Sequence, residues 1–141
     1  MIRAVLDTNV IVAGLRSRNG ASFGVLSQVA ERRVRPLMTI ALFLEYEAVL
    51  NRPEQTEAHG FSSREIAGFL SEFAALAEPV DLHFLWRPQL GDPADELVFE
   101  AAINGRSDCL ITYNVGDFAR AASRFGLKVT TPGMFLKELE R

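Results

Sequence analysis

The chain begins Met1-Ile2-Arg3-Ala4-Val5-Leu6-Asp7-Thr8-Asn9, a short and mostly apolar run that ends in polar residues. Such a run is typical of a buried β-strand. A second run, Cys109-Leu110-Ile111-Thr112, has the same character and continues into Tyr113-Asn114. Stretches of helical pattern separate these and the other short apolar runs. This alternation predicts an α/β fold in which helices cover both faces of a parallel sheet.

The rest of the pattern places the expected elements. Ser22 and Thr39 precede helical patterns as N-caps, and Gly105 and Gly126 follow helical patterns as stops. No linker or internal repeat interrupts the chain, and we expect one domain over residues 1–141. The expected helices run from Ser22 to about Arg33, from Thr39 until Pro53 ends the helix, and then over Ser62 or Ser63 to Leu76, Ala94 to Asn104, Asp117 to Phe125 and Pro132 to Leu139. Residues 35–39 are expected to form a brief strand or a connector, and further strands are expected at residues 80–85 and 128–130.

The composition limits what this chain can be. With 141 residues, 48% of them hydrophobic and 23% charged, it has enough apolar side chains for one folded core. Its single cysteine, Cys109, excludes a disulfide-stabilised scaffold. Its best apolar run, Ile40-Ala41-Leu42-Phe43-Leu44, is too short to cross a membrane, and Asp7 interrupts the first run before a signal peptide could form. We therefore expect a soluble, cytoplasmic protein.

The charge of the chain argues against bulk binding of polyanions, because the net charge is −3. Contact with nucleic acid would need a local basic surface. Apart from Lys128 and Lys137, every basic side chain is an arginine, whose planar guanidinium pairs well with phosphate. A coding bias explains the same composition, so composition alone does not decide between these interpretations.

Four carboxylates from separate segments are expected at one edge of this sheet. Right-handed crossovers bring the carboxyl ends of parallel strands together, and sites form in the crevice there. Asp7 ends the first strand, and Asp117 follows the strand that ends at Thr112. Glu45 lies on an apolar helical stripe, and Asp95 opens another helix. Each acid alone has an ordinary role as a turn residue, helix cap, first-turn acid or partner of an arginine, but their joint placement indicates a shared site.

A cluster of this kind suits a cation, because carboxylates without one repel each other. Oxygen ligands select hard divalent ions such as Mg²⁺ or Mn²⁺. Zinc is disfavoured, because His59 and His83 lack ligand spacing and there is only one cysteine. A bound Mg²⁺ fits phosphoryl transfer, since it lowers the pKa of a water that attacks phosphorus. We expect Thr112 and Asn114 either to hold ligands or the attacking water, or to complete the strand end and turn.

Four blocks of sequence occur in a fixed order: Val5-Leu6-Asp7-Thr8-Asn9-Val10, then Leu44-Glu45-Tyr46, then Asp92-Pro93-Ala94-Asp95-Glu96, then Leu110-Ile111-Thr112-Tyr113-Asn114-Val115-Gly116-Asp117-Phe118. In order and spacing, these blocks resemble the motifs of PIN-domain ribonucleases, in particular the VapC-like toxins of type II toxin–antitoxin systems. The resemblance covers nearly the whole chain. Many family members carry an acid where this chain has Asn114, so the last acid is expected to be Asp117.

The resemblance implies a three-layer α/β/α sandwich with a central, mainly parallel sheet. It also implies a Mg²⁺- or Mn²⁺-dependent endoribonuclease that hydrolyses RNA phosphodiester bonds, forms a homodimer and is inhibited by a cognate antitoxin protein whose tail enters the acidic groove. Among the crowded acids of the third block, Asp95 is favoured and Glu96 is next. The implied catalytic and metal-binding residues are Asp7, Glu45, Asp95 and Asp117, with Glu96 and Asp92 as further metal candidates and Thr8, Asn9, Thr112 and Asn114 as supporting polar residues.

The main alternative is a catalytically inactive PIN-like module that binds RNA or protein. Some relatives lose acids, but this chain keeps all four. A receiver-like phosphotransfer domain or an aspartate phosphatase is disfavoured, because Asp7-Thr8-Asn9 lacks the second acid that such sites need. The chain also has no GxSxG elbow, glycine-rich phosphate loop or dinucleotide-binding fingerprint. RNA hydrolysis is therefore the leading hypothesis.

Overall fold

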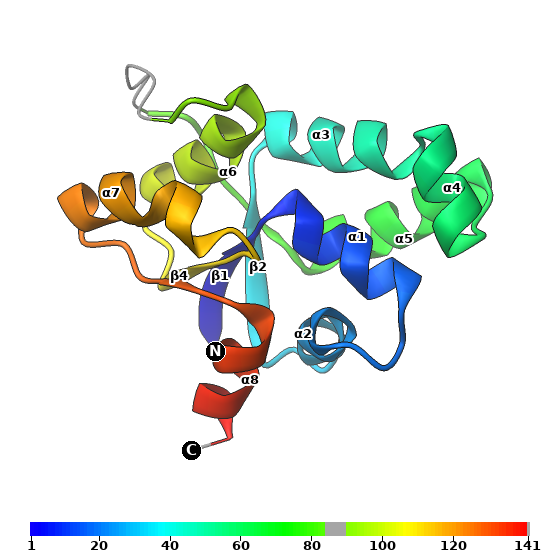
Figure 1. The fold of residues 1–141 in the computed structure, drawn as a ribbon, viewed down its shortest axis with the longest axis horizontal. Coiled ribbons are helices and arrows are strands. Elements are labelled where there is room, and N and C mark those ends of the chain that lie inside the picture. Colours follow the sequence, from blue (N-terminus) through cyan, green and yellow to red (C-terminus); the bar gives the residue numbers. More distant parts are fainter. Residues whose placement is uncertain (84–89, 141) are drawn as a thin grey trace.

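The strands of this protein are short and parallel, as the alternating sequence pattern predicted. The computed structural model describes residues 1–83 and 90–140, and Figure 1 shows how they are arranged. Within these residues the elements are β1 (Ile2–Leu6), α1 (Thr8–Arg16), α2 (Ala21–Ala30), β2 (Val34–Met38), α3 (Ile40–Leu50), α4 (Pro53–His59), α5 (Ser63–Leu76), β3 (Glu78–Pro79), α6 (Pro93–Asn104), β4 (Cys109–Ile111), α7 (Val115–Phe125), β5 (Val129–Thr130) and α8 (Pro132–Leu139).

Strand β1 lies at the centre of the sheet, whose order is β3-β2-β1-β4-β5. Every pairing is parallel, and Leu6 of β1 is level with Ile111 of β4. From β1 the chain proceeds to β2 on one side, whereas β4 and β5 lie on the other side. The boundary between β1 and β4 is therefore the topological switch point, where open α/β sheets place their binding crevices.

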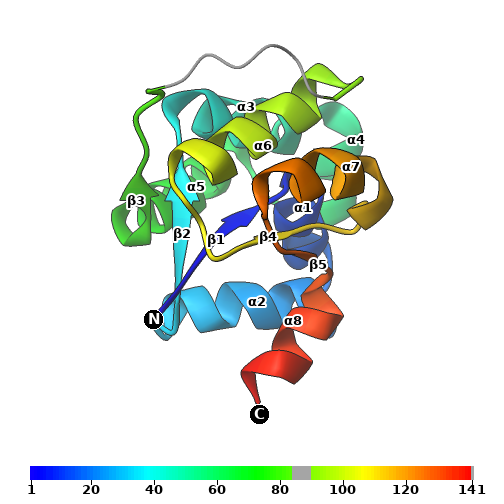
Figure 2. The same ribbon diagram turned by 90° about the vertical axis from the view of Figure 1, so that its left-hand side faces the viewer.

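Helices cover both faces of the sheet, which confirms the three-layer α/β/α sandwich. Helix α6 packs against β1, β2 and β4 and has α7 beside it. Helices α2 and α8 pack against each other on the opposite side of the sheet (Figure 2). Helices α3, α4 and α5 extend the molecule at one end (Figure 1). None of the helices in residues 1–83 and 90–140 has the length and apolar character needed to span a membrane.

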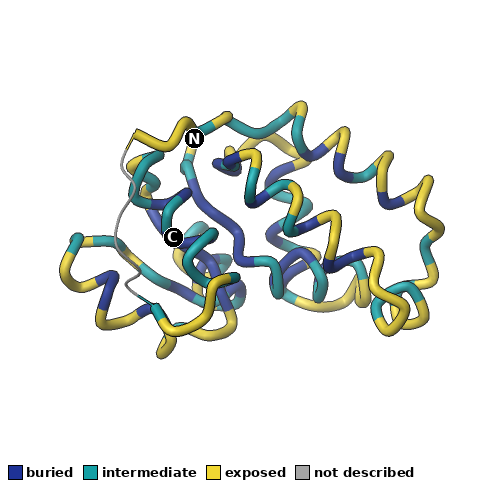
Figure 3. Tube along the Cα trace, turned by 90° about the horizontal axis from the view of Figure 1, so that it is seen from above, coloured by how far each residue is buried: buried dark blue, intermediate teal, exposed yellow. Residues whose placement is uncertain are grey.

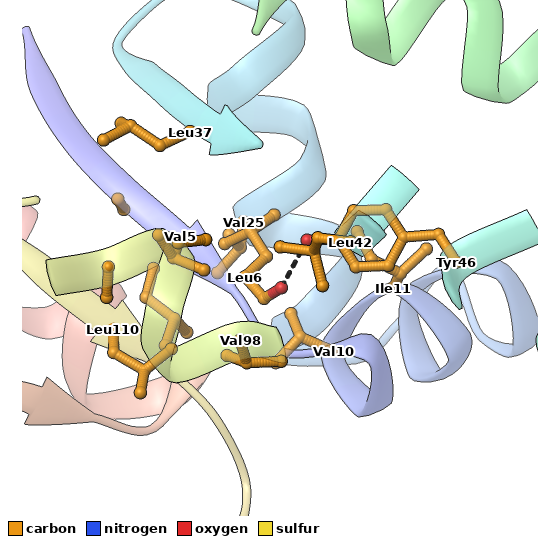
Figure 4. Packing of buried hydrophobic residues seen from close by; sticks show 14 of the residues in the cluster. Val5, Leu6, Val10, Ile11, Val25, Leu37, Leu42, Tyr46, Val98 and Leu110 are labelled. Atoms are coloured by element: carbon orange, nitrogen blue, oxygen red, sulfur yellow. Dashed lines mark hydrogen bonds between the residues drawn. The ribbon is translucent and has the colours of Figure 1, made fainter. Parts of the chain in front are cut away.

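The hydrophobic core follows β1 and occupies both of its faces. Ala4, Val5 and Leu6 are fully buried, as expected for the central strand of a parallel sheet. Figure 3 shows this buried segment running inward from the amino terminus. The same cluster contains Leu37 of β2 and Val98 of α6 (Figure 4). The packing holds the carboxyl end of β1 in place, and Asp7 is the next residue.

Several helices begin where the capping signals predicted. The Thr39 hydroxyl accepts a hydrogen bond from the Leu42 N–H (3.0 Å) at the start of α3. Ser62 and Glu65 form a reciprocal capping box at the start of α5. Thr131 caps α8, whose first residue is a proline. In these helices a local side-chain hydrogen bond sets the start, so the sequence signal is sufficient.

Other boundaries differ from the sequence prediction. The expected cap Ser22 is wrong: α2 begins at Ala21, and the buried Ser22 lies inside the helix with its hydroxyl bonded to Tyr113. The Ser22 hydroxyl therefore bonds to a residue far away in the chain instead of capping its own helix. Asp117 does not cap α7 either, because that helix begins at Val115 and Asp117 lies in its first turn. The polar residues after β1 do not form a turn, because α1 begins directly at Thr8.

The region after α3 also differs from the prediction. Pro53 does not simply end a long helix; α3 ends at Leu50, and Pro53 opens the separate helix α4. The strand expected at residues 80–85 is instead the two-residue strand β3, where Glu78 and Pro79 pair with β2. Residues 84 and 85 of that prediction lie outside the described residues.

Candidate functional site

Asp7 lies at the carboxyl end of β1, directly before α1 and at the switch point of the sheet. The residue is buried, with 6% of its surface exposed. Its backbone N–H donates to the carbonyl of Ile111 in β4 (2.9 Å). The pairing of β1 with β4 therefore fixes the backbone from which this carboxylate projects.

Thr112, the residue after β4, holds the Asp7 side chain. Its hydroxyl donates to Asp7 Oδ2 at 2.6 Å, and the hydroxyl oxygen accepts the backbone N–H of Asn114 at 2.9 Å. Thr112 is fully buried, so water does not compete for these bonds. The predicted meeting of the two polar strand ends is confirmed, and a single hydroxyl group connects them.

The environment of Asp7 disfavours its charged form. Burial raises the pKa of this carboxyl above its ordinary value. The hydrogen bond from Thr112 and the neighbouring backbone N–H groups of Thr8 and Asn9 act in the opposite direction but do not cancel the effect of burial. The negative charge of Asp117 adds to the upward shift in pKa. Additional positive charge at this position would therefore be favourable.

Two further acids act on the same position through their charge. Asp95 lies in the first turn of α6, and Asp117 lies in the first turn of α7. Burial raises the pKa of Asp95 to about 6, with contributions from the negative charges of Asp7, Asp92, Asp117 and Glu96. The negative charges of the acids at the end of β1 and in the first turns of α6 and α7 therefore act on one another, which we call the shared field.

The other two acids of the third block bind backbone groups. Asp92 is the N-cap of α6, and its Oδ1 accepts the N–H of Ala94 at 2.8 Å. The carboxylate of Glu96 accepts the backbone N–H of Leu90. Asp95 makes no comparable hydrogen bond with the described part of the chain. These contacts favour Asp95 over its two neighbours as the acid that is free to bind a ligand.

The supporting polar residues differ in their surroundings. Thr8 and Asn9 form the first turn of α1, and the buried atoms Thr8 Oγ1 and Asn9 Oδ1 have no hydrogen-bond partner among residues 1–83 and 90–140. Buried polar atoms are nearly always paired, so such an atom calls for a ligand or water. Asn114 is the exposed N-cap residue of α7, and it contributes to the site through its backbone N–H.

Glu45 is the predicted acid that has the weakest connection to the others. It is half-buried on α3, which packs against α1 and α6. The next residue, Tyr46, donates its hydroxyl to the carbonyl of Leu6, the residue before Asp7, at 2.5 Å (Figure 4). That bond brings this turn of α3 to the end of β1. Glu45 itself makes no hydrogen bond or ion pair with the described residues.

The family of the chain is shown by its sequence. Comparison with known protein families matches residues 3–116 to the PIN domain. The chain belongs to the PIN domain family. The match includes Asp7, Glu45 and Asp95 and ends one residue before Asp117. PIN domains are generally nucleases that use divalent metal ions. A comparison with curated proteins found no match.

The side chains of this PIN domain have the chemistry that a hard divalent cation requires. Carboxylate, hydroxyl and amide oxygens are the donors that Mg²⁺ and Mn²⁺ prefer. Burial is the main cause of the raised pKa values of Asp7 and Asp95, and neighbouring negative charges add to it; a cation would offset both effects. In the described ranges, no three Asp, Glu, His or Cys side chains are arranged to hold a metal ion. The fit therefore rests on the donor types, on the shared field and on the unpartnered oxygen of Asn9.

Sequence reasoning missed two tyrosines of this PIN domain. Tyr46 is fully buried among apolar residues, and its hydroxyl links α3 to the residue before Asp7. The available signal was a tyrosine in an apolar helix, because a buried tyrosine hydroxyl needs a partner. Tyr113 lies inside the polar block after β4 and bonds to Ser22. Its position in that block was visible, but its partner, which is 91 residues away in the chain, was not.

Proposed function

We propose that this PIN domain is a Mg²⁺- or Mn²⁺-dependent endoribonuclease that hydrolyses phosphodiester bonds of RNA. The observation that carries the proposal is the buried Asp7 carboxylate, which Thr112 holds at the end of β1 and which shares a field with Asp95 and Asp117. Carboxylates contributed by separate elements are suited to the cations of phosphoryl-transfer enzymes. Membership of the PIN domain family supports the proposal independently.

Each side chain has a distinct role in this proposal. Asp7, Asp95 and Asp117, together with Glu45 of α3, would hold the cation. When bound, the cation lowers the pKa of water and neutralises charge on the phosphate. Thr112 keeps the Asp7 carboxylate in one orientation, which preserves the geometry that hydrolysis needs. Asn9 contributes a hydrogen-bond acceptor in the first turn of α1.

We extend the proposal to a biological role as the toxin of a toxin–antitoxin pair that acts on RNA in the cytoplasm. The support is the resemblance of the four sequence blocks to VapC-like toxins. A cognate antitoxin with a basic segment would suit this crevice, because opposite charges on two partners favour association. The acids that make this edge of the sheet negative are Asp7, Asp92, Asp95, Glu96 and Asp117.

The proposed homodimer has a suitable surface on α3. Ile40 and Leu44 are exposed one helical turn apart, with 82% and 53% of their surfaces in solvent. Beside them lies an apolar cavity of about 350 Å³, lined by Met38, Phe43 and Pro79 among others. Exposed apolar surface of this kind is typical of protein–protein contacts.

A catalytically inactive module that binds RNA or protein is the second candidate. Two observations favour it: in the described residues, Glu45 makes no hydrogen bond or ion pair, and no three metal-binding side chains are grouped. The retention of Asp7, Glu45, Asp95 and Asp117 favours the enzyme. An RNA cleavage assay separates the two candidates directly.

The first prediction is that the purified protein cleaves single-stranded RNA with Mg²⁺ or Mn²⁺ and not in EDTA. Asp7→Asn keeps the size of the side chain and an acceptor for Thr112 but removes the charge. Cleavage by this variant should fall about a hundredfold or more, which corresponds to roughly 3 kcal/mol of transition-state stabilisation. Gel analysis of labelled RNA measures the rate.

Glu47→Gln is the matched control, because Glu47 is exposed on α3. This variant should cleave RNA at the wild-type rate. If Asp7→Asn also cleaves at that rate, the assignment of the site is wrong. Binding of RNA by the wild-type protein without cleavage at any metal concentration would instead favour the inactive module.

A further inference from the structure

Tyr113 lies at the end of β4 between Thr112, which holds Asp7, and Asn114, whose N–H binds Thr112. Its hydroxyl and the hydroxyl of Ser22 in α2 are 2.5 Å apart and share a hydrogen bond. Ser22 is 1% exposed, whereas Tyr113 is 46% exposed. The tip of the side chain is therefore anchored to a buried residue, while much of the residue remains in solvent beside the acidic site.

A surface tyrosine usually buries its apolar ring and leaves its hydroxyl in water. The Tyr113 hydroxyl instead bonds to a buried side chain, although 46% of the residue's surface is exposed. The anchored ring of Tyr113 has already lost much of the rotational freedom that binding would remove. A ligand that contacts the ring therefore binds with a smaller loss of side-chain entropy. The structural cost of exposing an aromatic ring is offset when the ring has a binding partner.

The position of Tyr113 indicates what such a partner would be. Thr112 is its neighbour in the chain and contacts Asp7 directly, so Tyr113 directly follows the residue that holds the carboxylate expected to meet the phosphate. Aromatic side chains stack on the unpaired bases of single-stranded RNA, largely independently of sequence. Arg16 and Arg18, which precede α2 in the chain, are exposed and make no ion pair with the described residues. Exposed arginines near the start of the helix that carries Ser22 would suit the phosphates of such a strand.

We propose that Tyr113 is a stacking platform for one nucleobase of single-stranded RNA, and that the hydrogen bond to Ser22 holds its ring in the stacking position. The inference rests on the proposed ribonuclease function for its location. It concerns recognition of the base, whereas the acids act on the phosphate.

The test compares the binding of two oligonucleotides to the same protein. One is a short single-stranded oligoribonucleotide of mixed sequence, and the other has the same sugar–phosphate chain without bases. Binding is measured by fluorescence anisotropy in the Asp7→Asn background, so that cleavage does not interfere. The oligonucleotide with bases should bind about tenfold more tightly, and Tyr113→Leu should remove most of this preference while affinity for the baseless chain stays unchanged.

Three further variants separate stacking from folding effects. Tyr113→Phe and Ser22→Ala each remove the anchoring bond and keep a ring, so both should weaken binding of the base-containing strand only a few-fold and to the same extent. Phe23→Leu removes an exposed ring from the residue next to Ser22, which projects about 100° away on the helix. This control should leave the preference for bases intact.

A second measurement uses the Asp7→Asn protein with Tyr113 intact. The fluorescent base 2-aminopurine, moved along the oligoribonucleotide, should be quenched on binding at the position that stacks on Tyr113. Absence of quenching at every position, or an unchanged preference for bases in Tyr113→Leu, overturns the inference even if the wild-type protein cleaves RNA. If the protein neither cleaves nor binds RNA, the proposed function and this inference both fail.

Discussion

Thr112 uses both capacities of its hydroxyl group, donating to Asp7 and accepting from Asn114. A buried hydroxyl that is satisfied in this way cannot rotate without breaking a bond, so it fixes the carboxylate it binds. The burial that orients Asp7 also raises its pKa, because a buried charge is costly. The same burial therefore fixes the orientation of the Asp7 carboxylate and makes its negative charge costly.

The raised pKa of Asp95 predicts how the stability of the metal-free protein depends on pH. The folded protein holds this proton up to about pH 6, whereas the unfolded chain releases it near 3.8. Between these values Asp95 is protonated in the folded state and ionised in the unfolded state, so its contribution to the free energy of unfolding falls as the pH rises. The raised pKa of Asp7 acts in the same direction. In Asp95→Asn, the free energy of unfolding should fall by about 1 kcal/mol less over this pH range than in the wild-type protein. The effect is limited to this size because solvent screens the charge of a partly exposed group.

Urea unfolding in EDTA across this pH range measures the effect. The slope of stability against pH should be smaller in Asp95→Asn than in the wild-type protein. Glu47→Gln, which changes an exposed acid on α3, should keep the wild-type slope. Equal slopes in Asp95→Asn and the wild-type protein would contradict the electrostatic description of the site. The comparison is needed because Glu78, whose pKa is lowered by its hydrogen bond with Arg3, contributes in the opposite direction in both proteins.

At the scale of elements, the hydrogen bond of Tyr46 links helix α3 to the end of β1. Tyr46 reaches the Leu6 carbonyl at 2.5 Å, and its ring contacts Phe73 of α5 edge to face at 5.9 Å. Burial, with a contribution from the charge of Asp7, raises the pKa of Tyr46 well above its ordinary value. The hydroxyl therefore stays protonated and donates this bond throughout the physiological pH range.

Tyr46→Phe should destabilise the protein, because it keeps the ring but leaves a buried carbonyl without this donor. The expected loss in the free energy of unfolding is about 1–3 kcal/mol. Tyr113→Phe is the matched change in the other tyrosine of the chain, and it should cost less, because its bond is only partly buried and its partner is a hydroxyl rather than a backbone carbonyl. Denaturant unfolding measures both variants, and equal stabilities of Tyr46→Phe and wild type would show that the bond does not secure α3.

The elements that were predictable from sequence are those with local signals. Strands β1 and β4 are apolar runs, and the starts of α3 and α5 are set by the caps Thr39 and Ser62. Helix α1 was missed, because Asp7-Thr8-Asn9 is typical of a turn and the helix is held by tertiary burial of Val10 and Ile11. Strand β3 was misplaced, because its two residues are defined by pairing with β2 rather than by a pattern of their own.

In the candidate site, too, some features follow from the sequence pattern and others depend on tertiary packing. Parallel topology predicts that Asp7 and Thr112 meet at one edge, and they do. The sequence could not decide among the acids of the third block, because that depends on which backbone N–H groups lie nearby: Asp92 caps α6, and Glu96 binds Leu90. It also gave no distance between Glu45 and the other acids, since that depends on how α3 packs.

At the scale of the whole molecule, the doubly wound sheet collects acids that are far apart in the chain. The order β3-β2-β1-β4-β5 places the ends of β1 and β4 side by side, and α6 and α7 begin near the same edge. Such a site exists only in the folded state. A cation that binds there must therefore stabilise the entire fold, because the unfolded chain has no equivalent site.

Mn²⁺ should accordingly raise the melting temperature of the wild-type protein. At a concentration about 100 times Kd the stabilisation is about 2.7 kcal/mol, or roughly 5–15 °C for a chain of this size. Asp7→Asn should abolish the shift in Tm and Glu47→Gln should keep it. Glu45→Gln is the decisive variant for α3: a reduced shift means that Glu45 joins the other acids around the cation. A full shift in Glu45→Gln would remove α3 from the site, and no shift in the wild-type protein would contradict a cation site at this edge of the sheet.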